Sequence, residues 1–321
     1  MKNEIDTTLR NPRSVGVLCG ALSYCLWGIL PLYWKVLKMV PAYEILSHRI
    51  VWSFLFVLAI LFCTKRLGRL GVVLKDRKTM ILITIASLLV GANWFIYIWA
   101  VNSDHIIQTS MGYYINPLVS ILLGTIFLKE KLGKGQYAAI FMASIGVVIL
   151  AVQYGRIPWV ALALAVTFAL YGLCKKIIAL ESAVGLALET AVLVPVALAF
   201  LLFRHVQGAG AYGTVSVSVT VLLSCSGVAT ATPLLLFAES AKRIELSTIG
   251  FLQYFTPTIS LILGVVVFKE SFTPAHMISF GFIWGGLVVY TLSQLKFIKK
   301  LSLFNGKTLQ QNEAPIETKS F

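Results

Sequence analysis

The sequence predicts an all-α integral membrane protein whose ten transmembrane helices form a 5+5 inverted-topology repeat. The chain of 321 residues is 58% hydrophobic and only 12% charged, whereas a soluble domain carries about 25% charged residues. No soluble fold has an interior large enough for so much apolar surface, so most of the chain must face lipid. The number of apolar runs and an internal repeat then predict the 5+5 organisation.

Ten apolar runs follow one another with short connections, and each is long enough to cross a bilayer core of about 30 Å. They cover residues 14–34, 43–63, 79–101, 108–128, 135–153, 157–174, 184–203, 217–238, 247–268 and 275–295. The first run follows Arg10 and Arg13, as a signal peptide would, but it is too long for one and lacks a cleavage site. Residues 64–78 mix basic and aliphatic side chains, which favours a short interfacial helix.

The basic residues predict the orientation of these helices. With ten spans both termini lie on one side, which holds 21 of the 27 lysines and arginines, while five fall on the other side and Arg49 lies within a span. Loops rich in Lys and Arg remain in the cytoplasm, so both termini are expected there. The net charge of +14 is then explained by sidedness, and no nucleic-acid partner is expected.

The chain contains an internal repeat. Shifted by 140 residues, 109–150 aligns with 249–290 without a gap, and nine positions are identical. The most similar stretches are YINPLVSILLGTIFLKE and YFTPTISLILGVVVFKE. Five helices per half is an odd number, so the second half enters the membrane inverted, as in many transporters. The expected parts are a cytoplasmic N-terminal segment (1–13), two five-helix repeats (14–153 and 157–295) and a disordered cytoplasmic tail (296–321).

The repeated helix has the pattern P-x-x-S-x-x-x-G followed by Lys-Glu, and it resembles the EamA branch of the drug/metabolite transporter superfamily. The first two helices contain YCLWGILPLYWKVL and EILSHRIVWS, which resemble the RarD family of bacterial inner-membrane permeases. This resemblance runs from about Gly16 to Leu295. It implies a secondary permease or exporter of a small organic solute, such as an amino acid, a metabolite or a drug, working by alternating access. It also implies a cavity formed by helices 1–4 and 6–9.

The second span carries most of the charge inside the predicted membrane. One arc of this helix must face the bundle, and it carries Glu44, His48, Arg49 and Trp52. A charge inside a bilayer costs about 2.5–3.5 kcal/mol, so these residues are functional candidates. Arg49 either binds an anionic, carboxylate-bearing substrate or is structural, snorkelling outward or pairing with Glu44. His48 is a candidate for substrate binding, and His48 and Glu44 are candidates for proton handling.

Glu189, in the seventh span, is a second candidate for proton coupling. It occupies a helix equivalent to the second span and lies about a turn and a half from the predicted cytoplasmic end. The alternative is an exposed helix-end residue near Lys175 and Lys176, and the sequence leaves both interpretations open.

A polar stripe follows the fourth span and recurs in the ninth. It comprises Thr109, Tyr113, Asn116, Ser120 and Gly124, repeated as Gln253, Thr256, Ser260 and Gly264. Pro117 and Pro257 remove a backbone hydrogen bond at matching depths and are predicted gating kinks. Tyr113, Asn116, Gln253 and the neighbouring Tyr254 are candidates for substrate binding. The serines and glycines are expected to permit close helix packing.

Aromatic side chains with polar neighbours are further candidates for substrate contact, because such surfaces suit amino acids or aromatic drugs. They are Tyr24 and Trp27 in the first span, Asn93, Trp94 and Tyr97 in the third, and Tyr171 in the sixth. Tyr33 and Trp34 lie near a membrane boundary and are expected in the aromatic belt.

Two other function classes compete with a carrier. A membrane enzyme acting on a lipid-soluble substrate needs a convergent catalytic or metal-binding set. The sequence lacks H-E-x-x-H, D-D-x-x-D, G-x-S-x-G and phosphate-loop motifs, and its four histidines are scattered. A channel needs a filter, usually in a symmetric oligomer, and no segment resembles one.

No catalytic residue, cofactor or metal site is therefore expected, and the five cysteines lack paired spacing. The expected partners are the lipid bilayer, a small-molecule substrate and a coupling proton or ion, with a homodimer left open.

Overall fold

The computed structural model describes residues 11–102, 106–155, 157–178, 180–267, 274 and 277–293. Within these ranges all regular structure is helical. The chain divides into two compact units. Unit 1 comprises Met1–Glu130 and Tyr154–Phe272, and unit 2 comprises Lys131–Gln153 and Thr273–Phe321.

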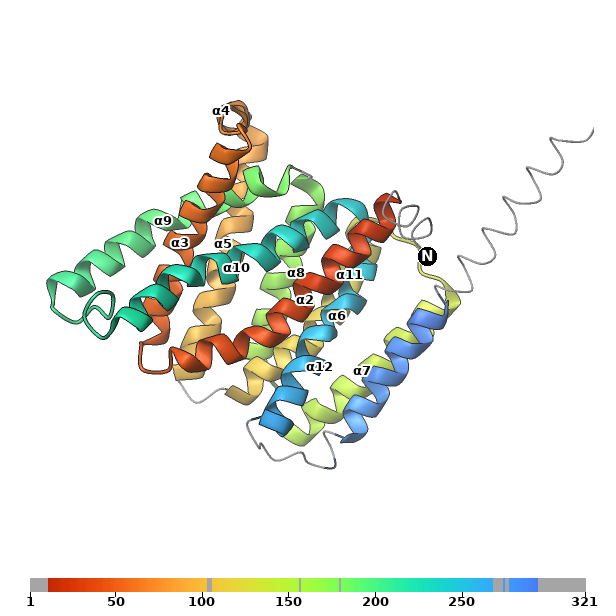
Figure 1. Cartoon of the computed structure of the whole chain (residues 1–321). Coiled ribbons are helices and arrows are strands. Elements are labelled where there is room, and N and C mark those ends of the chain that lie inside the picture. The colour runs from red at the N-terminus through yellow and green to blue at the C-terminus, as the bar shows by residue number, and fades with distance from the viewer. Residues whose placement is uncertain are drawn as a thin grey trace, which may run out of the picture. The chain divides into compact units, whose positions relative to one another are not determined.

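Unit 1 contains most of the helices (Figure 1). They are α2 (Pro12–Val36), α3 (Ala42–Cys63), α4 (Gly68–Lys75), α5 (Arg77–Asn102), α6 (Ile106–Phe127), α8 (Trp159–Ile178), α9 (Ser182–Val206), α10 (Val217–Arg243), α11 (Leu246–Gln253), α12 (Phe255–Ile262) and the π-helical turn η1 (Leu263–Val267). Unit 2 contains α7 (Lys134–Tyr154) and the helix Met277–Ser293.

The helices confirm the predicted ten-helix, all-α membrane fold. Among the described residues, eight helical spans are long and apolar enough to cross a membrane, and Met111–Phe127 and Met277–Ser293 are shorter apolar helices. Each predicted apolar run has a helical counterpart. The predicted interfacial segment also contains a helix, α4, whose residues are mostly exposed.

The ninth predicted span differs from the continuous helix that its apolar run predicts. It is divided at Tyr254 into α11 and α12, and it continues into η1. Pro257 lies in the first turn of α12, where a missing N–H is tolerated. Its repeat counterpart Pro117 lies inside the uninterrupted helix α6. Two segments with the same sequence pattern therefore have different helix geometry.

Local sequence explains where several helices begin. The Asn11 side chain accepts a hydrogen bond from the backbone N–H of Arg13, and Pro12 occupies the first position of α2. Ser216 caps α10 by accepting from the backbone N–H of Val219 at 3.1 Å. Asp76 precedes α5 and accepts from the Thr79 hydroxyl at 2.6 Å.

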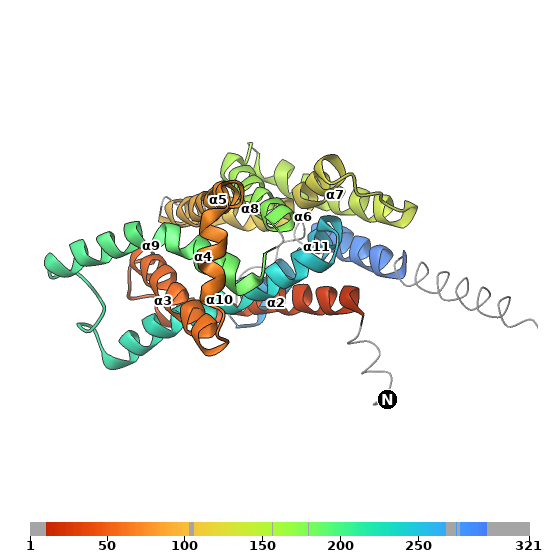
Figure 2. The ribbon, with the colours of Figure 1, turned by 90° about the horizontal axis from the view of Figure 1, so that it is seen from above.

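Helix α10 of unit 1 is in contact with both α2 and α3 (Figures 1 and 2). Small residues let α2 approach it closely. A Cβ atom placed on Gly20 would lie 2.7 Å from the Ser240 Oγ of α10 and 2.8 Å from Leu252 Cδ1 of α11. The Ser23 hydroxyl adds a 2.7 Å hydrogen bond to the Pro233 carbonyl of α10.

Replacing Gly20 by leucine is expected to destabilise unit 1. The added side chain has no space between α2 and α10, and overpacking of this kind costs about 1–3 kcal/mol. Gly71→Leu is the matched control, because Gly71 lies in a helix and has no neighbouring atom within 4 Å of a built Cβ. The thermal unfolding midpoint of the purified protein should fall for Gly20→Leu only. Equal midpoints for the two variants would contradict this packing argument.

Unit 1 has two ends with different character. At one end, helices α2, α9 and α11 begin and helices α3, α8 and α10 end. We call this end the ion-pair face, because Arg13 and Glu245 pair there at 3.5 Å, as do the residues described below. The main apolar core lies on this side and includes fully buried Leu61, Ile83 and Phe237. At the opposite end, the cavity face, α2 finishes and α3 begins.

Candidate binding cavity

Unit 1 contains a partly open cavity of about 260 Å³. Its walls come from α2, α3, α5, α6, α8, α10, α11 and α12, and Pro31, Trp34 and Ala42 line it near the cavity face. The structure brings eight of the predicted substrate-binding residues together around this space. They are Trp27, Arg49, Asn93, Trp94, Tyr97, Tyr113, Asn116 and Gln253. Helix α9, which corresponds to the seventh predicted span, contributes no residue to the lining. The family resemblance implied that this span helps to form the cavity, and for the cavity in unit 1 that expectation is wrong.

Arg49 is held between helices at the wall of the cavity. Its Nε donates a hydrogen bond to Thr230 Oγ1 of α10 at 2.9 Å. The guanidinium carbon lies 4.6 Å from the ring centroid of Trp34 and 5.3 Å from that of Trp94. Such contacts stabilise a cation through the quadrupole of each ring. The guanidinium carbon therefore lies over two indole rings.

The alternative in which Arg49 pairs with Glu44 is wrong. The Glu44 carboxylate is buried and accepts a 2.5 Å hydrogen bond from the backbone N–H of Ala211. Its other oxygen lies 3.8 Å from Arg204. Within the described ranges, none of the ion pairs involves Arg49. Arg49 is thus a cation without a carboxylate partner in that part of the chain.

The first span places Trp34 in the cavity, which corrects its predicted place in the aromatic belt. Trp27, Pro31 and Trp34 line the cavity together, and their spacing puts them on one face of α2. This spacing is the feature that could have identified Trp34. Tyr33 points elsewhere, and its hydroxyl donates to the Leu222 carbonyl of α10.

Amide and hydroxyl groups connect α6 to α11 beside the cavity. Gln253 Nε2 donates to the Ser120 Oγ at 3.0 Å, and that hydroxyl lies 3.4 Å from Asn116 Oδ1. The helices cross closely here, because a Cβ on Gly250 would lie 2.8 Å from the Pro117 carbonyl oxygen. Ser120 is fully buried, in keeping with the expected packing role.

Asn93 fixes the other side of the cavity by bonding α5 to α8. Its Nδ2 donates to the Leu164 carbonyl at 2.8 Å and to Thr167 Oγ1 at 2.9 Å. The Tyr24 hydroxyl is buried and has no hydrogen-bond partner among the described residues, although Tyr24 lines the cavity. An unpartnered buried hydroxyl is costly, so a ligand oxygen or nitrogen beside Tyr24 would stabilise it.

Three predicted substrate-binding residues lie away from the cavity lining. The His48 ring stacks on Tyr212 with centroids 5.0 Å apart. Tyr171 belongs to the core cluster and donates a 3.1 Å hydrogen bond to Glu189 Oε2. Tyr254 is buried at the break between α11 and α12. None of the three is among the cavity-lining residues.

Glu189 is buried and paired rather than exposed at a helix end. Lys175 Nζ donates to its Oε1 at 2.8 Å, and both side chains are almost completely buried. The Tyr171 hydroxyl completes the contact. The proximity to Lys175 that the sequence suggested is therefore confirmed, and the alternative of an exposed helix-end residue is wrong.

Both repeat prolines leave a carbonyl group without its helical partner. Proline has no N–H, so the carbonyl four residues earlier loses its usual bond. For Pro117 this residue is Tyr113, and for Pro257 it is Gln253. Both of these residues line the cavity.

Several cavity-lining residues were not predicted from the sequence, Thr230 and Phe168 among them. Thr230 lies in the stretch GVATATP of α10, where small and hydroxyl residues interrupt an apolar run. That composition could have identified a polar helix face. Phe168 is one of many phenylalanines in apolar runs, and its position carries no comparable feature.

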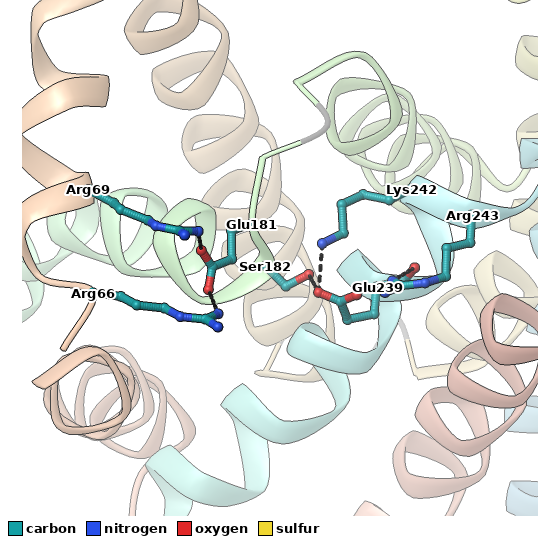
Figure 3. A network of polar contacts seen from close by, with 7 residues as sticks. All are labelled: Arg66, Arg69, Glu181, Ser182, Glu239, Lys242 and Arg243. Atoms are coloured by element: carbon teal, nitrogen blue, oxygen red, sulfur yellow. Dashed lines mark hydrogen bonds and ion pairs between the residues drawn. The ribbon is translucent and has the colours of Figure 1, made fainter. Parts of the chain in front are cut away.

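A network of ion pairs joins three parts of the ion-pair face (Figure 3). Arg66 and Arg69, from the segment after α3, pair with Glu181 just before α9. The adjacent Ser182 hydroxyl donates to Glu239 Oε1 of α10 at 2.5 Å. Lys242, at 2.6 Å, and Arg243 complete the Glu239 cluster. Burial raises the pKa of Glu181, but hydrogen bonds from Arg66 and Arg69 outweigh that effect and lower it.

The repeated Lys-Glu pair has a structural role at the same face. The Glu130 carboxylate accepts from the backbone N–H groups of Leu246 and Ser247 at 2.7 and 2.8 Å. These are free N–H groups at the start of α11, where a negative charge is favourable. Lys129 adopts a left-handed backbone with φ of 54°. The counterpart pair at 269–270 lies outside the described residues.

Comparisons with known proteins agree with this fold. Residues 14–152 and 156–292 each match the model of the EamA-like transporter family. The chain is 49% identical to the "Uncharacterized transporter YojE" of Bacillus subtilis (strain 168), over 88% of this chain and 95% of that protein. It is 41% identical to "Protein RarD" of Salmonella typhi and 38% identical to "Protein RarD" of Escherichia coli (strain K12), in each case over 87% of this chain and 95% of the relative.

A solved crystal structure also has a similar fold. It superposes with a TM-score of 0.69 at 20% identity and covers 89% of this chain and 99% of its own.

Proposed function

The chain belongs to the EamA-like transporter family, and from this premise we propose that it is a secondary carrier of a small organic solute in the bacterial inner membrane. It is a multi-pass membrane transporter. The observation that carries the proposal is the cavity in unit 1, which takes residues from both repeats and is lined by one cation and three side-chain amides. A closed ion-pair face opposite the cavity face supports alternating access, because a carrier opens to one side at a time.

The repeat prolines support the same mechanism. The fourth span is one helix with Pro117 in its interior, while the ninth is divided near Pro257. In an inverted repeat, the two halves can exchange such conformations, and the cavity then opens toward the other side. With both termini in the cytoplasm, the cavity face is periplasmic and the ion-pair face cytoplasmic.

The two candidate coupling carboxylates fit packing roles better than proton transfer. Glu189 has a lysine at 2.8 Å, and Glu44 has an arginine at 3.8 Å and a backbone N–H at 2.5 Å. A paired carboxylate must break those contacts to take up a proton. We therefore assign coupling to the substrate cavity or to an ion bound with substrate.

Replacing Pro117 or Pro257 by alanine is expected to slow turnover more than it weakens binding. Alanine restores the missing N–H. In α6 this N–H can bond to the Tyr113 carbonyl and stiffen the helix, and at position 257 it can bond to the Gln253 carbonyl and favour the joining of α11 and α12. Exchange rates in proteoliposomes should show a several-fold lower maximal rate with a smaller change in half-saturation. Pro195→Ala is the control, because Pro195 lies inside α9, which does not line the cavity. Unchanged maximal rates in both repeat variants would remove the gating role.

Reconstitution tests the carrier mechanism directly. Purified protein in liposomes is offered labelled amino acids and aromatic acids, with the same unlabelled solute inside or absent. A carrier gives saturable uptake that internal solute accelerates. Uptake proportional to concentration, without acceleration, would contradict a carrier and indicate a channel.

A further inference from the structure

We propose that the cavity selects organic monoanions, each a carboxylate attached to an aromatic or other apolar body, over zwitterionic amino acids and amines. This inference rests on the proposed carrier function and names the substrate class of the same site. It assigns the carboxylate to Arg49, at the Thr230 side of the cavity, and the apolar body to the aromatic wall around Trp27 and Phe168.

The donors of Arg49 are the first argument. A guanidinium group carries five N–H donors, and only the Nε donor is used within the described structure, toward Thr230. Within the described residues no hydrogen bond uses the Nη donors, so they are available to a ligand in the cavity that Arg49 lines. Arg49 Cζ lies over the indole rings of Trp34 and Trp94, and we expect a ligand to meet the edge of the guanidinium group that carries the Nη donors. Edge-on approach is the geometry of a bidentate carboxylate.

The charge of the cavity is the second argument. Among the described lining residues Arg49 is the one cation, and no aspartate or glutamate accompanies it. A monoanion brings the site to neutrality. A zwitterion leaves the net positive charge in place and adds an ammonium group that has no carboxylate to meet it. An amine adds a second positive charge at a depth where uncompensated charge is costly.

The third argument concerns two of the lining amides, Gln253 and Asn93, and the apolar walls. Ser120 already engages both amide ends of Gln253, at 3.0 and 3.3 Å, and Asn93 Nδ2 already has two acceptors. Much of the remaining wall is aromatic and aliphatic, with Trp27, Phe168 and Leu234 among its residues. Burial of an apolar ligand body against such walls is favourable at about 25 cal/mol per Å².

Four probes with one ring separate the possible ligand charges. They are 3-phenylpropanoate, 3-phenylpropanamide, phenethylamine and phenylalanine, with sulfate as an inorganic anion. Binding to the purified full chain is measured by the unfolding midpoint and by quenching of tryptophan fluorescence. Phenylpropanoate should raise the midpoint and quench, because Trp34 and Trp94 flank its carboxylate site. The other four should have at least tenfold weaker effects.

Arg49 variants locate the site of binding. Arg49→Gln should weaken phenylpropanoate binding by roughly tenfold to a hundredfold, the range for hydrogen bonds to a charged group. Arg49→Lys should recover part of it, since lysine keeps the charge but not the fork of donors. Lys38→Gln is the control, because it removes an exposed cation near the cavity face. Equal binding of phenylalanine, the amine or sulfate, unaltered binding in Arg49→Gln, or no binding of the acid would each overturn the proposal.

Uptake experiments distinguish failure of the substrate class from failure of the carrier mechanism. If liposomes exchange phenylalanine but not phenylpropanoate, the carrier function stands and the selection of monoanions is overturned. If phenylpropanoate binds in an Arg49-dependent manner but does not move across the membrane, the ligand class stands and the carrier function fails.

Discussion

Replacing Arg49 by alanine is expected to abolish transport while the chain still inserts and folds. The side chain supplies the charge of the cavity, and two indole rings and Thr230 hold it in place. Its removal leaves the aromatic wall intact but takes away the group that orients the substrate. A loss of about 1.5–3 kcal/mol in substrate binding lowers occupancy roughly tenfold to a hundredfold, which brings exchange close to background.

The fold should tolerate this change. A charge inside the bilayer costs about 2.5–3.5 kcal/mol on insertion, so its removal offsets the lost contacts with Thr230, Trp34 and Trp94. Yield in the membrane and the elution profile of the purified protein should match those of the native chain. Uptake of a transported solute is then compared among native protein, Arg49→Ala and Lys38→Gln. Native rates in Arg49→Ala would show that the cation is structural.

Thr230 gives a milder version of the same test. Thr230→Val removes the acceptor of the 2.9 Å bond from Arg49 Nε with little change in shape. The guanidinium group remains but is no longer fixed by Thr230. The substrate concentration that gives half-maximal transport should therefore rise, while the preference for anionic over zwitterionic substrates persists. This separates the positioning of Arg49 from its charge.

Periodicity and motif identity were sufficient to predict the helices and the repeat. The apolar runs have helical counterparts because a lipid-exposed helix must satisfy its own backbone hydrogen bonds. Two residues of the polar stripe of the fourth span, Tyr113 and Asn116, line the cavity, because helical spacing places them on one face of the helix. Position along a helix was a poorer guide. Trp34 lies near the end of α2, yet the cavity extends to that depth.

Pairings between distant segments could not be predicted from helical spacing. Glu44 shares an arc with Arg49, but its partners are Arg204 and the Ala211 backbone from another part of the chain. The division of the ninth span could not be predicted either. The ninth span and α6 share the same proline-containing pattern, yet α6 is continuous. In both cases packing between helices decides the outcome, and a single helix's sequence contains no information about its neighbours.

Reversing the charge of Glu181 is expected to open the ion-pair face. Glu181 accepts from Arg66 and Arg69, and its neighbour Ser182 bonds to Glu239 (Figure 3). Glu181→Arg replaces two attractions by repulsion. Exposed pairs contribute about 0.2–1 kcal/mol each, so the loss of both and the added repulsion should increase the open population several-fold.

The rate at which a thiol reagent labels Cys174 measures the opening of the ion-pair face. Cys174 is half-buried and packs against the core beneath the ion-pair face. In a chain whose other cysteines are replaced by serine, a membrane-impermeant thiol reagent should label Cys174 several-fold faster in Glu181→Arg. Asp76→Arg is the control, because Asp76 is an exposed acid that bonds only within its own segment, to Lys78 and Thr79. Equal labelling in the two variants would show that the network does not hold the face closed.

Charge exchange and pH provide two independent tests of whether the ion pairs of Glu181 hold the ion-pair face closed. Glu181→Arg combined with Arg66→Glu and Arg69→Glu restores the attraction and should return Cys174 labelling toward the native rate. The pKa of Glu181 is lowered by its arginine partners, so its contribution is fully present above the ordinary glutamate pKa and is lost as pH falls through the lowered value. The reactive thiolate is lost in acid, so the labelling rate of Cys174 is divided by that of a small free thiol at the same pH. This ratio in native protein should stay constant at neutral pH and rise only in acid. In Glu181→Gln that acid-dependent rise should be smaller, because the titrating group is gone.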